Sequence, residues 1–148
     1  MLSLPISQDM YEELDETLLD YLADPATYRD YLTREKRADD IAGHARAPMS
    51  CPLQRYLYEC LRTRADNAAF WRELILVTVQ GDSVVLYWSL SSLNSNTVET
   101  YAFEPPDWVS DFTNTVDEGK ETGAPITCDR AVWYLDGIIM RQREDGER

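Results

Sequence analysis

The chain has 148 residues, of which 44% are hydrophobic, and its aromatic residues include 9 Tyr and 4 Trp. A chain of this length and composition can bury a core of its own, which excludes wholesale disorder and predicts a single domain over residues 1–148. The net charge of −13 repels phosphate groups, so direct binding to nucleic acid or to anionic lipid is disfavoured, whereas a basic partner is attracted.

The sequence indicates a cytoplasmic protein. No apolar run approaches the roughly 20 residues that cross a bilayer, and residues 1–7 lack the basic start and the apolar stretch of a secretory signal. The three cysteines, Cys51, Cys60 and Cys128, cannot all pair within one chain. Free thiols are typical of a reducing compartment, and we therefore expect a cytoplasmic location.

The N-terminal segment predicts an acidic amphipathic helix over residues 8–23. Ser7 is a suitable N-cap, and Ile6 and Tyr11 have the spacing of a hydrophobic staple. Apolar residues recur at helical spacing and define a buried stripe, which consists of Tyr11, Leu14, Leu18 and Leu22. At about 100° per residue, the opposite side carries the carboxylates of Asp9, Glu12, Glu13, Glu16 and Asp20.

Two further helices are predicted over residues 25–64. Asp24 is an N-cap with Pro25 at the first helical position, and a helical period continues through Tyr28, Tyr31, Leu32, Ala38 and Ile41. This second helix is therefore expected to reach the early forties, with Gly43 and Pro48 marking its end. Cys51-Pro52 then begins a third helix, whose apolar stripe consists of Leu53, Tyr56, Leu57, Cys60 and Leu61.

A β-meander is predicted over residues 73–103. Two β-branched and aromatic runs, 74–79 and 84–90, flank a turn that contains Gly81, and an alternating third strand spans 97–103. The run from Val84 to Trp88 shows no alternation of polarity, so we expect this strand to be covered on both faces. Connections this short favour three antiparallel strands.

The C-terminal part predicts two helices within residues 106–141. The first has an inner stripe of Trp108, Val109, Phe112 and Val116 and ends near Gly119. Thr127 can cap the last helix, in which Ala131, Leu135, Ile138 and Ile139 face inward, and the charged tail from Arg141 is expected to fray. The predicted order is ααα-βββ-αα, and helices that cover a small antiparallel sheet make the fold α+β.

Catalytic signatures are scarce. The single histidine, His44, stands beside Gly43 at a predicted helix end, and neither a nucleophile elbow nor a glycine-rich phosphate loop is present. The cysteines form no Cys-x-x-Cys pair, and Cys60 falls on an apolar stripe. Cys51 begins a helix, where the dipole could stabilise its thiolate, but a small residue at a helix start is the simpler reading. The sequence favours a non-enzymatic role and predicts neither a cofactor nor a metal.

The acidic helix is the most suggestive functional feature. Residues 1–28 carry seven acids and no Lys or Arg. We predict that Asp9, Glu12, Glu13, Glu16 and Asp20 bind a basic protein surface, so that the chain acts as an interaction or regulatory protein. In one version the carboxylates imitate nucleic-acid phosphates and occupy a nucleic-acid-binding protein, as a phage or mobile-element inhibitor would. The competing explanations are a solvated surface and adaptation to a saline cytoplasm.

Two other features offer alternatives. Residues 29–72 carry nine bases against six acids, which could contact an acidic partner but are explained more simply by i,i+4 pairing on helix surfaces. A small enzyme or ligand-binding domain is the alternative function. Its pocket, between sheet and helices, would be walled by Tyr87, Trp88, Tyr101 and Trp108, although such aromatics are more often part of a core.

Overall fold

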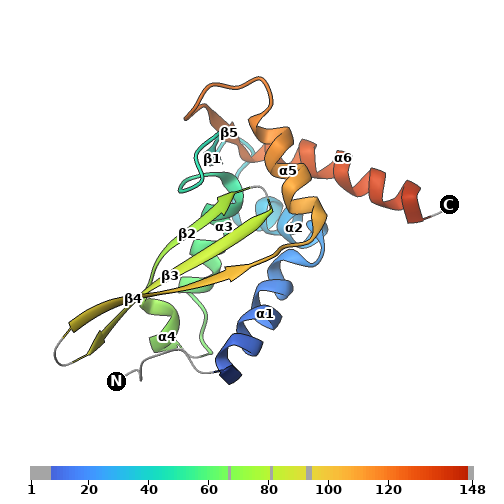
Figure 1. Ribbon diagram of the computed structural model, residues 1–148. Coiled ribbons are helices and arrows are strands. Elements are labelled where there is room, and N and C mark those ends of the chain that lie inside the picture. The colour runs from blue at the N-terminus through green and yellow to red at the C-terminus, as the bar shows by residue number, and fades with distance from the viewer. Residues whose placement is uncertain (1–7, 67, 81, 93–94, 147–148) are drawn as a thin grey trace.

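The computed structural model describes residues 8–66, 68–80, 82–92 and 95–146, and its side chains except those of 8–11, 90–92 and 95–97 (Figure 1). The predicted N-cap Ser7, the staple between Ile6 and Tyr11 and the turn glycine Gly81 lie outside these described parts. Within them the fold is α+β and contains six helices, a three-stranded antiparallel sheet and a two-stranded sheet. No helix in the described ranges has the length and apolar character needed to span a membrane.

The first two helices begin where the sequence predicts. Helix α1 spans Gln8–Leu22 and buries Leu14, Leu18 and Leu22. Helix α2 spans Pro25–Glu35, and the Asp24 carboxylate accepts a hydrogen bond from the Ala26 amide at 2.9 Å. This cap satisfies one of the free amides of the first turn, while Pro25 has none to satisfy.

The predicted extension of the second helix into the early forties is wrong. Lys36 is already extended, and the Asp40 carboxylate accepts a hydrogen bond from the Arg37 amide at 2.9 Å, which closes a turn. The carbonyls of Ala38 and Asp40 accept hydrogen bonds from the amides of Asp129 and Cys128. Because the backbone of this segment finds its partners elsewhere in the chain, the helical spacing of Ala38 and Ile41 has no structural counterpart.

A two-stranded sheet replaces the predicted helix end. Strand β1, Ile41–His44, pairs antiparallel with β5, Pro125–Thr127. Neither strand was predicted, and His44 lies in β1 rather than at a helix end. The sheet presses against the start of the third helix, since a Cβ on Gly43 would lie 2.3 Å from the backbone nitrogen of Pro52. Only glycine allows this approach.

The third helix is confirmed and a short fourth one is new. Helix α3 spans Pro52–Arg62, and its predicted stripe is buried except for the half-buried Cys60. Helix α4, Ala68–Arg72, follows within a few residues and buries Phe70 and Trp71. Five residues are too few to show a helical period, which is why the sequence pattern did not reveal α4.

The predicted meander is confirmed as strands β2 (Leu74–Gln80), β3 (Ser83–Ser92) and β4 (Ser95–Phe103), in that spatial order. The expectation that β3 is covered on both faces is wrong. Its side chains alternate: Val84, Leu86 and Trp88 are buried, whereas Val85 and Tyr87 are half-buried. Apolar residues therefore occupy both faces of β3, but only one face packs fully into the core.

The last two helices complete the fold. Helix α5 spans Asp107–Asp117 and buries all four residues of its predicted stripe. Helix α6 spans Cys128–Gly146 and packs against α2 and α5 through Ala131, Leu135 and Ile138. The predicted fraying from Arg141 is wrong, because the helix continues to Gly146 and its last turns extend away from the rest of the molecule (Figure 1).

Candidate functional site

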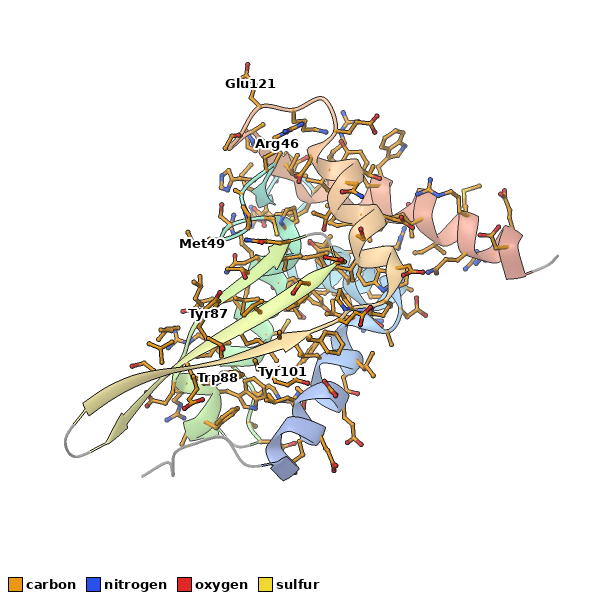
Figure 2. The ribbon with its side chains drawn as sticks, in the orientation of Figure 1. Arg46, Met49, Tyr87, Trp88, Tyr101 and Glu121 are labelled. Atoms are coloured by element: carbon orange, nitrogen blue, oxygen red, sulfur yellow. The ribbon has the colours of Figure 1, made fainter. Side chains whose placement is uncertain are left out.

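Most of the carboxylates predicted to bind a partner are exposed on α1. Glu12, Glu13, Glu16 and Asp20 are exposed, opposite the buried leucines of the same helix, while the side chain of Asp9 is outside the described part of the chain. Asp15 has a different role, because its carboxylate accepts a hydrogen bond from the Tyr101 hydroxyl. Tyr101 belongs to β4, so this contact joins the helix to the sheet (Figure 2).

One flank of α1 forms a groove with α4 and the segment that precedes it. The groove has a volume of about 490 Å³. We call it the acidic groove, and it is lined by Glu13, Leu14, Glu16, Thr17, Asp20, Arg64, Asp66, Phe70 and Trp71. The structure thus brings Glu13, Glu16 and Asp20 to one concave surface, whereas Glu12 is exposed outside it.

Aromatic rings form the base of the acidic groove. Phe70 and Trp71 are only 5% and 4% exposed, and their ring centroids lie 4.9 Å and 5.9 Å from that of the fully buried Trp88. The rings are therefore held by the core rather than by the groove itself. Such a rigid base costs little conformational entropy when it contacts a ligand.

Arg64 lies inside the acidic groove and shows how the groove holds a cation. Its guanidinium is 5.8 Å from the ring centroids of both Tyr21 and Trp71, and its Nη1 donates a hydrogen bond to the Tyr21 hydroxyl at 2.8 Å. These are contacts that a guanidinium makes readily with aromatic faces. A cationic side chain and an aromatic base thus already meet in this groove.

The acidic groove keeps an excess of negative charge. Glu13, Glu16, Asp20 and Asp66 contribute four carboxylates against the single cation of Arg64, which leaves a charge of −3. Within the described ranges, none of these four carboxylates makes an ion pair. Carboxylates on a concave surface reinforce one another's potential, since part of their surroundings is protein rather than water.

Two bases of the segment 29–72 form ion pairs among the described residues, and neither pair runs along one helix as the sequence suggested. Arg29 pairs with Asp136 of α6, and Lys36 pairs with Glu59 of α3 at 3.2 Å. The Arg46 amide donates a hydrogen bond to the Asp117 carboxylate at 2.8 Å, with Arg46 in the left-handed region at φ +53°. These contacts run between elements rather than along one helix.

The four aromatics of the alternative hypothesis do not gather around a cavity. Trp88 and Trp108 are core residues, and the Trp108 indole donates a hydrogen bond to the Leu22 carbonyl at 2.6 Å. Tyr87 faces the side of the sheet opposite Trp88, since neighbouring residues of a strand point to opposite faces. None of the four lines the acidic groove.

The cysteines and the histidine form no reactive arrangement. Cys51 begins α3 as predicted, but it is buried, and burial raises the pKa of its thiol to about 11. Burial also raises the pKa of Cys60 to about 12 and that of Cys128 above its ordinary value. In the part of the chain that the structure describes, no three His, Cys, Asp or Glu side chains are grouped as metal ligands.

Sequence reasoning could place Glu13, Glu16 and Asp20 on one side of a helix, but it missed Arg64, Asp66, Phe70 and Trp71. An Asp four residues before an aromatic pair is the only local signal that these residues give, and this pattern does not predict a groove. The acidic groove depends on residues more than forty positions apart in the sequence. Its chemistry must be read from its own geometry, because no family model, no curated protein and no solved structure matches this chain.

Proposed function

We propose that this protein is a non-enzymatic binding protein that captures a basic protein surface in the acidic groove. The observation that carries the proposal is the combination, in one concavity, of a rigid aromatic base and four carboxylates that form no ion pair with any described residue. A lysine or arginine side chain suits both parts, because its apolar stem packs on rings while its charged end reaches carboxylates.

The charge of the whole chain supports the same function. A net charge of −13 attracts a basic partner from a distance, and the excess of −3 in the groove then orients it. Arg64 supports the choice of arginine, since its own guanidinium already lies over the Trp71 ring of the groove. Three unpaired cysteines fit a reducing, cytoplasmic setting for this encounter.

A charge-reversal variant tests the groove. In the triple variant Glu13→Lys, Glu16→Lys and Asp20→Lys, affinity for an arginine-rich peptide should fall by about a hundredfold or more, because attraction becomes repulsion at the contact itself. The measurement is a calorimetric titration at fixed salt, with circular dichroism to verify that the helices remain.

The matched control changes the same net charge elsewhere. Asp39, Glu104 and Glu121 are exposed on other parts of the surface, and Glu121 lies far from α1 (Figure 2). Their triple replacement by Lys should lower the affinity for the arginine-rich peptide by less than tenfold, since only long-range attraction is lost. Equal losses in the two triple variants would mean that net charge alone attracts the peptide, and the groove would not be the site.

The nucleic-acid-mimic version of the proposal predicts a further property of the partner, namely that it binds DNA or RNA through the same surface. A partner captured from lysate through the groove should be released by competing DNA or RNA, because the carboxylates would occupy its phosphate-binding surface. A captured basic partner that binds normally in the presence of nucleic acid would leave the groove as a protein-binding site without mimicry.

A further inference from the structure

Arg64 is the one cation among the described residues that line the acidic groove, and it belongs to the segment between α3 and α4. Helix α3 ends at Arg62, and the hydroxyl of the C-cap residue Thr63 donates a hydrogen bond to the Glu59 carbonyl at 2.9 Å. The Arg64 amide then donates to the Leu61 carbonyl at 3.3 Å. The end of α3 therefore fixes the backbone of Arg64, while its side chain reaches into the groove.

The guanidinium of Arg64 is held by aromatic side chains rather than by carboxylates. It lies 5.8 Å from the ring centroids of Tyr21 and Trp71, and its Nη1 donates a hydrogen bond to the Tyr21 hydroxyl. It forms no ion pair with any described residue, although four carboxylates line the same groove. Its Nε is buried without a hydrogen-bond partner among the described residues. Because an unpaired buried donor costs free energy, the site holds Arg64 only weakly.

The place that Arg64 occupies suits a guanidinium better than an ammonium. A guanidinium is planar and weakly hydrated, so it can lie against the Trp71 ring while its edge donates a hydrogen bond to the Tyr21 hydroxyl. The ammonium of lysine is a compact, strongly hydrated charge and loses more hydration in such a place. An arginine side chain of a partner could therefore make the contacts that Arg64 makes now.

Two guanidinium groups cannot occupy this place at the same time. They would overlap sterically, and their like charges repel one another at short range. An arginine of the partner therefore enters only when Arg64 has left. Leaving gives up the contacts with Tyr21 and Trp71, but it returns the unpaired Nε to water. The occupied state does not bind the partner's arginine, so it lowers the apparent affinity in proportion to its population.

We propose that Arg64 is a resident occupant of the acidic groove and that an arginine side chain of the basic partner replaces it against Tyr21 and Trp71. This exchange rests on the proposed function and deepens it in two ways. It names arginine rather than lysine as the side chain that the groove recognises. It also makes Arg64 a competitor that excludes weakly bound cations, so that only a partner with further contacts to the carboxylates displaces it.

Arg64→Ala tests the exchange, because a competitor and a binding contact predict effects of opposite sign. The affinity for an arginine-rich peptide should rise by about fivefold or more, since the variant vacates the place and changes the charge of the groove from −3 to −4. Arg64→Gln, which keeps a long polar side chain without the charge, should shift the affinity in the same direction. Calorimetric titration at fixed salt measures both, and circular dichroism verifies the fold. An unchanged or lower affinity would overturn the proposal.

Arg62→Ala is the matched control. The Arg62 guanidinium lies 5.3 Å from the Tyr58 ring centroid and its Nη1 donates to the Tyr58 hydroxyl at 3.0 Å, so it makes the same two contacts with a tyrosine outside the groove. The variant removes the same charge two residues away and should raise the peptide affinity by less than about twofold, through long-range attraction alone. Equal gains in Arg62→Ala and Arg64→Ala would mean that Arg64 is not an occupant.

Small cations test the choice of arginine. In Arg64→Ala, methylguanidinium should displace the peptide more effectively than methylammonium at the same concentration and ionic strength, because only the guanidinium matches the vacated place. In the wild-type protein, where Arg64 fills that place, the two cations should differ less. Equal displacement by the two cations in Arg64→Ala would overturn the choice of arginine.

The triple charge reversal at Glu13, Glu16 and Asp20 distinguishes a failure of the exchange from a failure of the proposed function. If that variant binds the peptide as well as the wild-type protein does, the groove is not the site and the proposed function fails. If it loses affinity while Arg64→Ala gains none, the groove remains the site and only the exchange is overturned. A loss in the first variant together with a gain in the second supports both.

Discussion

At the scale of single residues, the hydroxyl of Tyr28 is an unusual feature of the core. Tyr28 is fully buried, with ring centroids 4.4 Å from Tyr56 and 5.6 Å from Phe112. Its hydroxyl has no hydrogen-bond partner within the described structure, whereas the Tyr56 hydroxyl donates a bond to the Tyr21 carbonyl at 3.2 Å. A buried polar group without a partner costs free energy that a matching hydrocarbon would not.

Tyr28→Phe should therefore leave the free energy of unfolding unchanged or raise it by about 1 kcal/mol, because the variant removes only an unsatisfied hydroxyl. Tyr56→Phe is the matched control and should lower it by about 1 kcal/mol, since it removes a hydrogen bond. Urea unfolding followed by tryptophan fluorescence measures both. A clear loss of stability in the Tyr28 variant would mean that its hydroxyl is paired in solution.

At the scale of elements, the contact between β1 and the start of α3 is the tightest that a glycine makes in the described structure. A Cβ on Gly43 would lie 2.3 Å from Pro52 N and 2.5 Å from the Cys51 carbonyl carbon, and both are backbone atoms. Backbone cannot move aside as a flexible side chain can, so the strand and the helix would have to separate. The short sheet depends on this one residue type.

Gly43→Ala should lower the free energy of unfolding by about 1–3 kcal/mol, the usual range for overpacking. The matched control is Gly137→Ala, in the middle of α6, where the methyl meets nothing closer than 3.8 Å. There alanine should raise stability by about 0.5–1 kcal/mol through its higher helix propensity. If both alanines had the same effect on urea unfolding, the close approach at Gly43 would not exist.

At the scale of the whole molecule, the three thiols make the free energy of unfolding decrease as the pH rises in the alkaline range. Burial raises the pKa of Cys51 to about 11 and that of Cys60 to about 12, and it also raises that of Cys128. In the unfolded chain these thiols ionise near their ordinary pKa of about 8.5–9. The unfolded state therefore loses protons first, and stability falls as pH rises above 9 towards the folded-state values.

We expect the free energy of unfolding to be nearly independent of these thiols at pH 7 and to decline between pH 9 and 11. Cys51, which is 4% exposed, should contribute about 2 kcal/mol of that decline. Urea unfolding at successive pH values measures it, and Cys51→Ala should flatten the slope. An unchanged slope in that variant would show that the Cys51 thiol is not protected by folding.

The longer elements could be predicted from the sequence, and the shortest could not. Periodic stripes place α1, α3 and α5, and β-branched runs place the meander, because each of these elements repeats its pattern several times. Strands β1 and β5 have four and three residues, one containing Gly43 and the other Pro125, so no period exists to detect. Their pairing is fixed by contacts across the chain, which also ended α2 early.

The acidic groove shows the same limit for the candidate site. The acidic side of α1 follows from helical geometry alone, which is why Glu13, Glu16 and Asp20 could be singled out. That Glu12 lies outside the groove depends on where α4 packs, and this is decided by the contacts of Phe70 and Trp71 with Trp88. The sequence around α1 and α4 does not predict the contact of Phe70 and Trp71 with Trp88.

The pairing of β1 with β5 also has a consequence for the chain during synthesis. Ile41 pairs with Thr127 in the register of this small sheet. The backbone hydrogen-bonding groups of residues 41–44 therefore have no strand partner until more than eighty further residues have been translated. Until then the nascent α2 and α3 are joined by an unpaired strand, which a chaperone or a neighbouring nascent chain could engage. The two-stranded sheet can therefore form only after residues 125–127 have been synthesised.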